Sequence, residues 1–158
     1  IQDHVVNPLM DNIILIINKL GDLGVLPLIV GIIVLLTKKY IEYGVATILS
    51  VVMCIVIGII GLKNIIKRIR PCWVDTSVRM LIPRPTDYSF PSGHSMNAFA
   101  GARIIYYINK KIGIVAFLLA TLIAFARVYL FVHYPTDVVN GAILGVIFSI
   151  ISVKIIEE

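Results

Sequence analysis

The chain has 158 residues, of which 59% are hydrophobic and 15% are charged, and its mean hydropathy is +0.98. Soluble domains typically carry about 25% charged residues, so this composition excludes an ordinary soluble domain and predicts a polytopic membrane protein. The net charge of +5 comes from short basic clusters between apolar runs. This pattern favours membrane lipids and phosphate as partners and argues against nucleic acid.

The first 22 residues contain an amphipathic segment. Its hydrophobic residues recur with helical spacing, while polar residues fill the other face. The hydrophobic set is Val6, Leu9, Met10, Ile13, Ile16, Ile17 and Leu20. We expect residues 1–22 to form a helix lying in the membrane interface, with a sixth membrane crossing as the alternative. The chain begins at Ile1 rather than Met, which is consistent with a missing leading segment, and no signal peptide is visible.

Five apolar runs follow, and we interpret them as membrane-crossing helices. They cover approximately residues 23–37, 43–62, 94–108, 112–132 and 138–156. The first and third are short against the ~20 residues that a crossing needs, so we expect their ends to extend into flanking residues. Gly141 and Gly145 form a small-xxx-small pair that predicts close helix packing. Because no internal repeat or low-complexity linker interrupts the chain, residues 1–158 are expected to form a single membrane-embedded domain.

A basic string ends the second apolar run. Lys63 precedes Arg70 by two helical turns, so both side chains share one face if the helix continues to Pro71. Proline disfavours helical conformation at the residue before it, which leaves the Arg70 guanidinium free to bind phosphate oxygens. The alternative is a juxtamembrane basic cluster, because Lys67 and Arg68 lie between the two.

The second string, Pro91-Ser92-Gly93-His94, has the features of a helix start. Ser92 is a good N-cap, and Gly93 lets an anion approach backbone N–H groups at the positive end of the helix dipole. His94 lies in the first turn, where a titratable imidazole can protonate a leaving oxygen. Asn97, one turn later, is a candidate for lining the same site. The alternative is an ordinary capped helix with an interfacial histidine.

The third string consists of Arg127, His133 and Asp137. Pro135 suits the first turn of a helix, so Asp137 is an early-helix residue whose carboxylate can turn back toward His133. Such a carboxylate fixes the imidazole tautomer and leaves the other ring nitrogen as a nucleophile. Arg127 adds a third cation. The alternative is a snorkelling arginine beside a capping aspartate.

In their order and spacing, the three strings resemble the pattern of the type 2 phosphatidic acid phosphatase superfamily, from about Lys63 to the end of the chain. The resemblance implies an all-α membrane bundle of five to six helices with an acid-phosphatase/haloperoxidase-like core. It also implies a lipid phosphatase in which His133 is phosphorylated, Asp137 is its partner and His94 is the general acid. The phosphate-binding residues implied are Lys63, Arg70, Ser92, Gly93 and Arg127. One departure is Ala126, where the family usually has serine.

The same residues predict a reaction that needs no metal and no cofactor. Lys63, Arg70 and Arg127 already offer three positive charges, and the only carboxylate in the strings, Asp137, is needed by His133. Undecaprenyl pyrophosphate is the first expected substrate, with phosphatidylglycerol phosphate and phosphatidic acid as alternatives. A phosphotransferase and a non-catalytic membrane protein with a vestigial anion site are the other functions considered.

The connectors alternate between two faces of the membrane and place all three strings on one face. A loop of about 20 residues on that face, which includes Asp75 and Asp87, is long enough to be a lid or recognition element. Basic residues do not decide which face is cytoplasmic. The resemblance to bacterial relatives places the site outside the plasma membrane, where Cys72 is expected to react with an impermeant maleimide.

Overall fold

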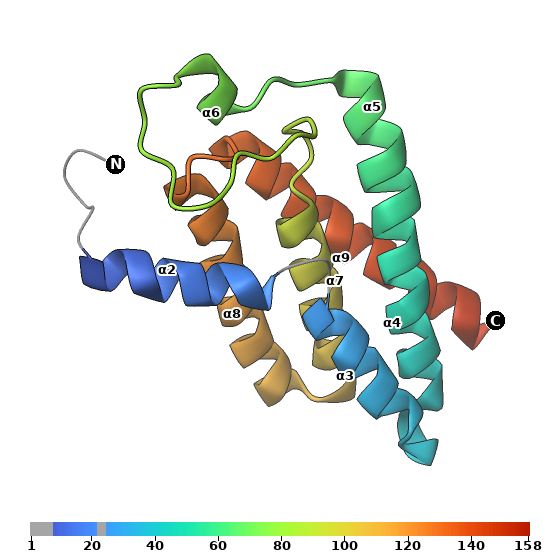
Figure 1. Cartoon of the computed structure of the whole chain (residues 1–158). Coiled ribbons are helices and arrows are strands. Elements are labelled where there is room, and N and C mark those ends of the chain that lie inside the picture. Colours follow the sequence, from blue (N-terminus) through green and yellow to red (C-terminus); the bar gives the residue numbers. More distant parts are fainter. Residues whose placement is uncertain (1–7, 22–24) are drawn as a thin grey trace.

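The computed structural model describes residues 8–21 and 25–158, and every regular element in these ranges is helical. This confirms the predicted all-α fold (Figure 1). The helices α4, η3 and α5 follow one another without a break and together form one long helix. The other long helices are α2, α3, α7, α8 and α9. The elements are α2 (Pro8–Leu20), α3 (Val25–Leu35), η2 (Lys38–Tyr40), α4 (Ile41–Met53), the π-helical η3 (Cys54–Leu62), α5 (Lys63–Ile66), α6 (Pro71–Val74), α7 (Gly93–Ile108), α8 (Lys110–Tyr129) and α9 (Pro135–Glu157).

Helix α7 lies at the centre of the bundle and packs against α8, α9, α3 and α4. Its contact with α9 is close, as the glycine pair predicts. A Cβ atom on Gly145 would lie 2.1 Å from the carbonyl oxygen of Met96, and one on Gly141 would lie 2.6 Å from that of Ser92. Larger residues would separate the two backbones. These glycines therefore hold the start of α7 against the start of α9.

Among the residues that the structure describes, three helical stretches are long and apolar enough to cross a membrane, namely Lys38–Val74, Lys110–Tyr129 and Pro135–Glu157. The predicted lengthening of the third apolar run is wrong, because α7 has only 16 residues. Ser92 caps its start, and Asn109 ends it and at once caps α8 by accepting hydrogen bonds from the N–H groups of Lys111 and Ile112. Membrane crossing by α7 and by the 11-residue α3 stays a prediction.

Helix α2 runs crosswise to the bundle (Figure 1). Residues 8–20 of the predicted segment form a helix, whereas residues 1–7 lie outside the described ranges. The position of this helix in the membrane interface stays a prediction. Its buried residues are Ile14 and Asn18, while Leu9 and Ile16 point outward with exposures of 72% and 64%. The helix therefore turns a partly polar face to the protein and an apolar face outward, as a helix in the membrane interface would.

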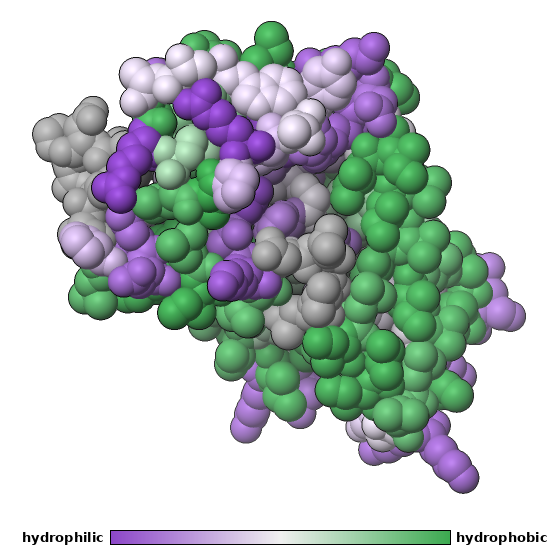
Figure 2. All heavy atoms as spheres, viewed as in Figure 1, coloured by the Kyte–Doolittle hydropathy of each residue, from purple (hydrophilic) through white to green (hydrophobic). Residues whose placement is uncertain are grey.

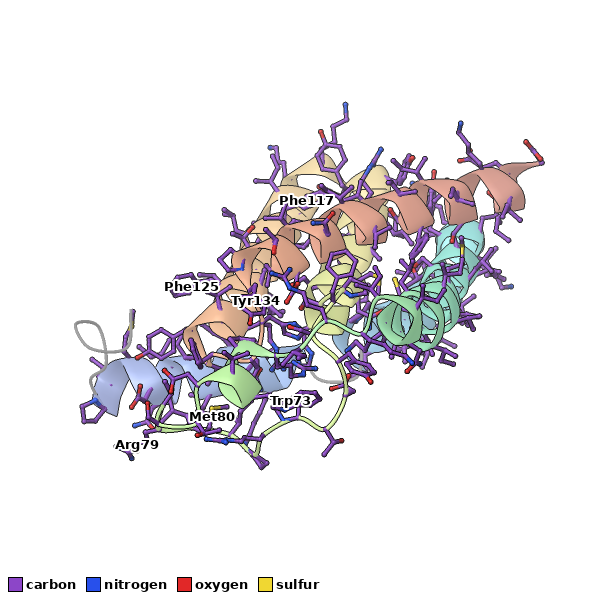
Figure 3. All side chains as sticks on the ribbon, turned by 90° about the horizontal axis from the view of Figure 1, so that it is seen from above. Trp73, Arg79, Met80, Phe117, Phe125 and Tyr134 are labelled. Atoms are coloured by element: carbon purple, nitrogen blue, oxygen red, sulfur yellow. The ribbon has the colours of Figure 1, made fainter. Side chains whose placement is uncertain are left out.

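The segment after α6 covers the end of the bundle at which α5, α6 and the start of α9 lie (Figure 1). Trp73 of α6 and Met80 of this segment (Figure 3) pack against a buried cluster that includes Ile14 of α2 and Cys72. Cys72 is 0% exposed, so the expectation that it is accessible is wrong. Pro71 starts a helical turn, and that turn directs the thiol into the cluster. Hydrophilic side chains gather over this end, whereas hydrophobic ones cover α3 and α4 (Figure 2).

Candidate active site

Lys63 and Arg70 come together, although not by the predicted route. The helix ends at Ile66, because Lys67 adopts a left-handed conformation with φ 50°, and the chain is extended by Arg70. The condition for one shared helical face, a helix that continues to Pro71, is therefore not met. Both side chains are nevertheless buried, with residue exposures of 5% for Lys63 and 2% for Arg70. The bend replaces the two-turn helical spacing and lets the guanidinium reach back into the bundle.

An acidic side chain joins the two cations. Asp87 Oδ2 accepts from Lys63 Nζ at 2.5 Å, and Asp87 Oδ1 accepts from Arg70 Nη2 at 2.6 Å. Arg70 Nε also donates to the carbonyl oxygen of Asp87 at 2.6 Å. The Asp87 side chain is half exposed, so its carboxylate lies where an anion arriving from solvent would meet both cations. Its two oxygens occupy donors that the sequence assigns to phosphate oxygens.

The third guanidinium nitrogen of Arg70, Nη1, determines which ring nitrogen of His133 carries the proton. Arg70 Nη1 lies 3.2 Å from His133 Nε2 and 2.7 Å from the carbonyl oxygen of Val132. A guanidinium can only donate hydrogen bonds, so Nε2 must be the accepting nitrogen and the ring proton must be on Nδ1. The Nε2 lone pair therefore faces the cation pair. This is the tautomer that a nucleophilic histidine requires.

Asp137 and Ser89 hold the other side of the imidazole. Asp137 is the third residue of α9, as predicted, and its Oδ2 accepts from the backbone N–H of Tyr134 at 3.0 Å. Oδ2 lies 3.7 Å from His133 Nδ1, which is longer than a direct hydrogen bond. Ser89 Oγ lies between them, 2.5 Å from Oδ2 and 3.4 Å from Nδ1. The predicted pair is adjacent, and the serine bridges it.

Arg68 completes the surroundings of Asp137. Its Nη1 donates to Asp137 Oδ1 at 2.6 Å and to Thr136 Oγ1 at 2.7 Å, and its guanidinium lies over the ring of Tyr134 at 4.2 Å. Asp137 is fully buried, so a carboxylate there needs several donors to remain ionised. Arg68, Ser89 and the Tyr134 N–H supply them. Ion pairing with Arg68 thus fixes the carboxylate that faces His133.

The second string forms the predicted helix start. Ser92 is the N-cap of α7 and is fully buried, and its hydroxyl accepts from Ser95 N at 3.5 Å and Ser95 Oγ at 3.0 Å. Ser92 N also donates to the carbonyl oxygen of Asp137 at 3.1 Å, which links the second string to the third. Gly93 and His94 are the first two residues of the helix. His94 is half-buried and therefore reachable by a ligand.

Arg127 lies near the end of α8 and is 5% exposed. Its Nη1 donates to the Oδ1 atom of Asn18, which is itself 6% exposed and comes from α2. Tyr129, two residues further along α8, donates to Asp11 Oδ1 on α2 at 2.9 Å. Polar residues on the inner face of α2 thus fasten the last turn of α8, including the third predicted phosphate-binding cation.

Burial determines the protonation state of His133. Removal from water lowers the pKa of His133 to about 3, and the nearby charges of Arg70, Arg127 and Lys63 act in the same direction, whereas the adjacent Asp137 carboxylate opposes them. The imidazole is therefore neutral at physiological pH and can act as a nucleophile. For Asp87, partial burial opposes ionisation, but Lys63 and Arg70 outweigh it and hold the pKa below its usual range.

Two cavities open onto these residues. One of about 790 Å³ reaches His133 between the segment after α6, α2 and the α8–α9 corner, with Asp11, Arg79 and Tyr134 among its walls. Another of about 450 Å³ lies beside Lys63, Trp73 and Asp87. Within the described part of the chain, no group of three or more His, Cys, Asp or Glu side chains is placed to hold a metal ion. Metal independence stays a prediction.

Four residues with a place in the site were missed or undervalued from sequence. Arg68 was assigned to a basic cluster, Asp87 only to a long loop, and Ser89 and Asn18 were not singled out. Ser89 and Asp87 lie within five residues of the second string, and that proximity was the available signal. Nothing in the sequence connects Asn18 with Arg127, which lies 109 residues later.

The chain is similar to a known protein family over most of its length. The sequence pattern of the PAP2 superfamily matches residues 39–158. An undecaprenyl-diphosphatase from Sulfolobus acidocaldarius is 35% identical over 122 residues, which are 77% of this chain and 59% of that protein. The crystal structure of Aquifex aeolicus LpxE is similar with a TM-score of 0.83 at 33% identity, over 95% of this chain and 88% of that one.

A transmembrane PAP2 type phosphatidylglycerolphosphate phosphatase from Bacillus subtilis gives a TM-score of 0.80 at 29% identity, over 97% of this chain and 79% of that one. The chain spans 59% of the Sulfolobus protein's length, so the match does not extend to all of that relative. The two solved structures, in contrast, match nearly all of this chain, including the elements that precede residue 39.

Proposed function

The chain belongs to the PAP2 superfamily, and we therefore propose that this integral membrane protein is a lipid phosphatase that releases the terminal phosphate of a lipid phosphate or diphosphate. One observation carries the proposal. His133 Nε2 accepts from Arg70 Nη1 at 3.2 Å, so a neutral imidazole directs its lone pair toward two buried cations. A site that only bound anions would not need a nucleophile in this orientation.

The proposed reaction has two steps. The substrate phosphate displaces the carboxylate of Asp87 and binds to Lys63, Arg70 and Arg127. His133 Nε2 then attacks phosphorus, the bond from phosphorus to the leaving oxygen breaks, and His94 gives that oxygen a proton. The imidazole becomes cationic, and the Nδ1 proton directed at Ser89 and Asp137 stabilises that charge.

In the second step, His94 takes a proton from water as the water oxygen attacks phosphorus. The bond between phosphorus and Nε2 breaks, and this step regenerates neutral His133 and releases inorganic phosphate. Each proton and each electron pair is thereby returned, so the cycle needs no other reactant. The catalytic residues proposed are His133, His94 and Asp137, and the phosphate-binding residues are Lys63, Arg70, Ser92, Gly93 and Arg127.

Undecaprenyl pyrophosphate is the proposed substrate, and the Sulfolobus relative named as an undecaprenyl-diphosphatase supports it. Phosphatidylglycerol phosphate is the second candidate, supported by the B. subtilis phosphatase of known structure. The experiment is phosphate release by the purified protein from both lipids and from phosphatidic acid. His133→Ala, checked for an unchanged melting temperature, should lose nearly all turnover, and the wild type should yield an acid-labile phosphoenzyme. Wild-type turnover in His133→Ala would refute the proposed nucleophile.

We also propose that the protein lies in a bacterial plasma membrane with this site outside the cytoplasm. The short turns that contain Lys38, Lys39, Lys110 and Lys111 lie at the opposite end of the bundle, where the positive-inside rule favours the cytoplasm (Figure 1). The exposed Thr76 offers a test. Thr76→Cys should react with an impermeant maleimide in intact cells, and the wild type should not, because both native cysteines are buried. Labelling only after permeabilisation would place the site inside.

A further inference from the structure

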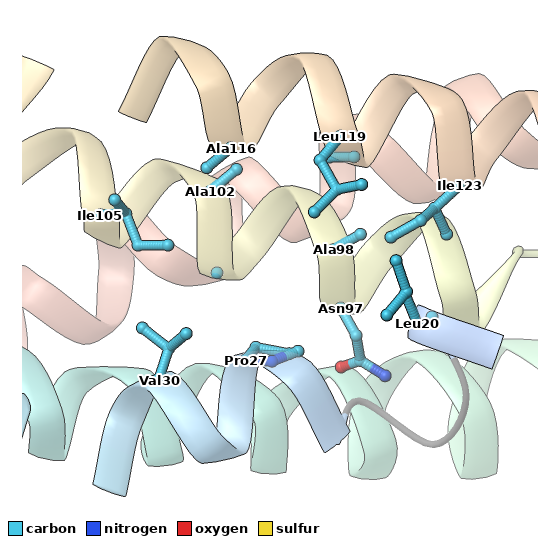
Figure 4. Close-up of a pocket in the computed structure, with 13 residues that line it drawn as sticks. Leu20, Pro27, Val30, Asn97, Ala98, Ala102, Ile105, Ala116, Leu119 and Ile123 are labelled. Carbon is cyan, nitrogen blue, oxygen red and sulfur yellow. The ribbon is translucent and has the colours of Figure 1, made fainter. Parts of the chain in front are cut away.

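A cavity of about 180 Å³ lies between α3, α7 and α8, away from the phosphate-binding cations (Figure 4). Its walls are almost entirely apolar, and small residues of α7 and α8 leave the space open. These residues are Ala98, Gly101, Ala102, Ala116 and Ala120. Gly101 also lets α3 approach, because a Cβ atom there would lie 2.8 Å from Cβ of Pro27. Larger side chains at these positions would close the space.

One polar group interrupts the apolar wall. Asn97 is 4% exposed, and its Oδ1 atom has no hydrogen-bond partner among the described residues. Figure 4 shows its amide between α7 and the start of α3, at the end of the cavity where Leu20 and Ile123 lie. A buried polar atom without a partner costs about 1–3 kcal/mol, so this amide is poised for a partner that the protein does not supply.

The Asn97 end of the cavity adjoins His94. Asn97 follows His94 by one helical turn of α7. Gly21 connects the two from the other side, because a Cβ atom there would lie 2.9 Å from Cδ2 of His94 and 2.6 Å from Cγ2 of the wall residue Ile123. The opposite end is formed by Val30 and Ile105 (Figure 4). The cavity therefore runs along α7 away from His94 for about 12 Å, the rise of eight helical residues.

We propose that this cavity binds the first part of the hydrocarbon chain of the lipid phosphate, with the Asn97 amide bonded to an oxygen where the chain joins the head. The inference rests on the proposed function, because the proposed reaction decides on which side of the phosphorus atom the hydrocarbon chain lies. In phosphoryl transfer the attacking and leaving atoms are roughly in line, so a leaving oxygen lies opposite His133 and beside His94. The hydrocarbon chain is attached to that leaving group, and this cavity provides an apolar path that begins beside His94.

Non-hydrolysable alkyl phosphonates test the cavity separately from catalysis. Binding of ethylphosphonate and dodecylphosphonate would be measured in detergent for the wild type, Ala98→Leu and Ala116→Leu. Filling the cavity should lower dodecylphosphonate affinity about tenfold more than ethylphosphonate affinity, the equivalent of about two methylene groups left outside. Val115→Phe, which enlarges a 64% exposed side chain of α8, is the matched control and should bind like the wild type.

The outcomes separate the two proposals. Equal affinity changes for both phosphonates in each variant that folds, or loss in Val115→Phe alone, would overturn the cavity assignment. Selective loss in either alanine variant would support it even if the purified protein hydrolysed no lipid phosphate. The absence of hydrolysis would refute the proposed phosphatase activity and leave the cavity assignment standing. Asn97→Ala should change the affinity of both phosphonates little, because a phosphonate carbon replaces the junction oxygen that the amide would contact.

Discussion

Asp87→Asn is expected to strengthen phosphate binding. In the structure the carboxylate accepts from Lys63 at 2.5 Å and from Arg70 at 2.6 Å, so phosphate must displace it to use both cations. Asparagine keeps the size of the side chain and removes its charge. The substitution should therefore free the two cations without changing the backbone bond from Arg70 to residue 87.

The magnitude follows from the exposure of the carboxylate. Because Asp87 is half exposed, each ion pair is screened by water and contributes about 0.5–1 kcal/mol. Two pairs give about 1–2 kcal/mol, so phosphate affinity should rise about 5- to 30-fold. Lys63 and Arg70 hold the pKa of Asp87 below its usual range, so the carboxylate is ionised at neutral and mildly acidic pH. Phosphate, rather than mild acid, is what displaces it.

The assay is inhibition by inorganic phosphate or vanadate, or direct calorimetric binding of phosphate if turnover is low. Asp75→Asn is the matched control, because Asp75 is an exposed aspartate of the same segment whose side chain bonds to Ser77. The control should behave like the wild type. Weaker or unchanged phosphate binding in Asp87→Asn would show that the carboxylate supports the site rather than competing for it.

Four further predictions concern the same site. Since burial lowers the pKa of His133 to about 3, the acid limb of kcat/KM should lie well below pH 6 for an aryl phosphonate monoester, whose charge is constant there. The free energy of unfolding should fall as the pH drops below about 6.5, because His133 binds a proton in the unfolded chain but not in the folded protein. His133→Gln should lose this pH dependence. An unchanged pH dependence in that variant would refute the assignment of a low pKa to folded His133. Arg68→Gln should lower kcat about tenfold or more, because Asp137 loses the guanidinium that holds it. Lys67→Gln, at the exposed neighbouring residue, should leave kcat unchanged. Equal losses in the two variants would show that kcat depends on the overall positive charge and not on the bond to Asp137. Chelator should leave turnover intact, and a strict requirement for added magnesium would contradict the assignment of charge to Lys63, Arg70 and Arg127.

Much of the architecture follows from local rules. Hydrophobic periodicity located α2, continuous apolar runs located α7 and α9, and the serine and proline signals fixed where α7 and α9 begin. Gly141 and Gly145 predicted the close contact of α7 with α9 because a backbone contact needs small residues. The convergence of the three strings also followed, since alternating connectors place them at one end of the bundle.

The features that sequence reasoning missed depend on tertiary contacts. Lys67 is not a residue that favours a left-handed conformation, so the end of the helix at Ile66 had no local signal. Cys72 is buried because α2 and the segment after α6 cover it, and no pattern in the sequence predicts that cover. The link from Arg68 to Asp137 spans 69 residues and exists only once the chain has bent at Lys67.

Helix α2 turns polar side chains toward the protein, and these side chains contact residues of the candidate site although α2 lies outside the part of the chain that matches the family pattern. The matched pattern starts at residue 39, after α2 and α3. A protein shortened to that boundary would retain all three strings, yet Arg127 would lose its amide partner Asn18 and the apolar cavity would lose the wall formed by Pro27 and Val30. Leu9 and Ile16 face outward from the same helix. If α2 lies in the membrane interface as predicted, its contact with lipid is connected through Asn18 to Arg127, and lipid composition would then affect how firmly that arginine is held.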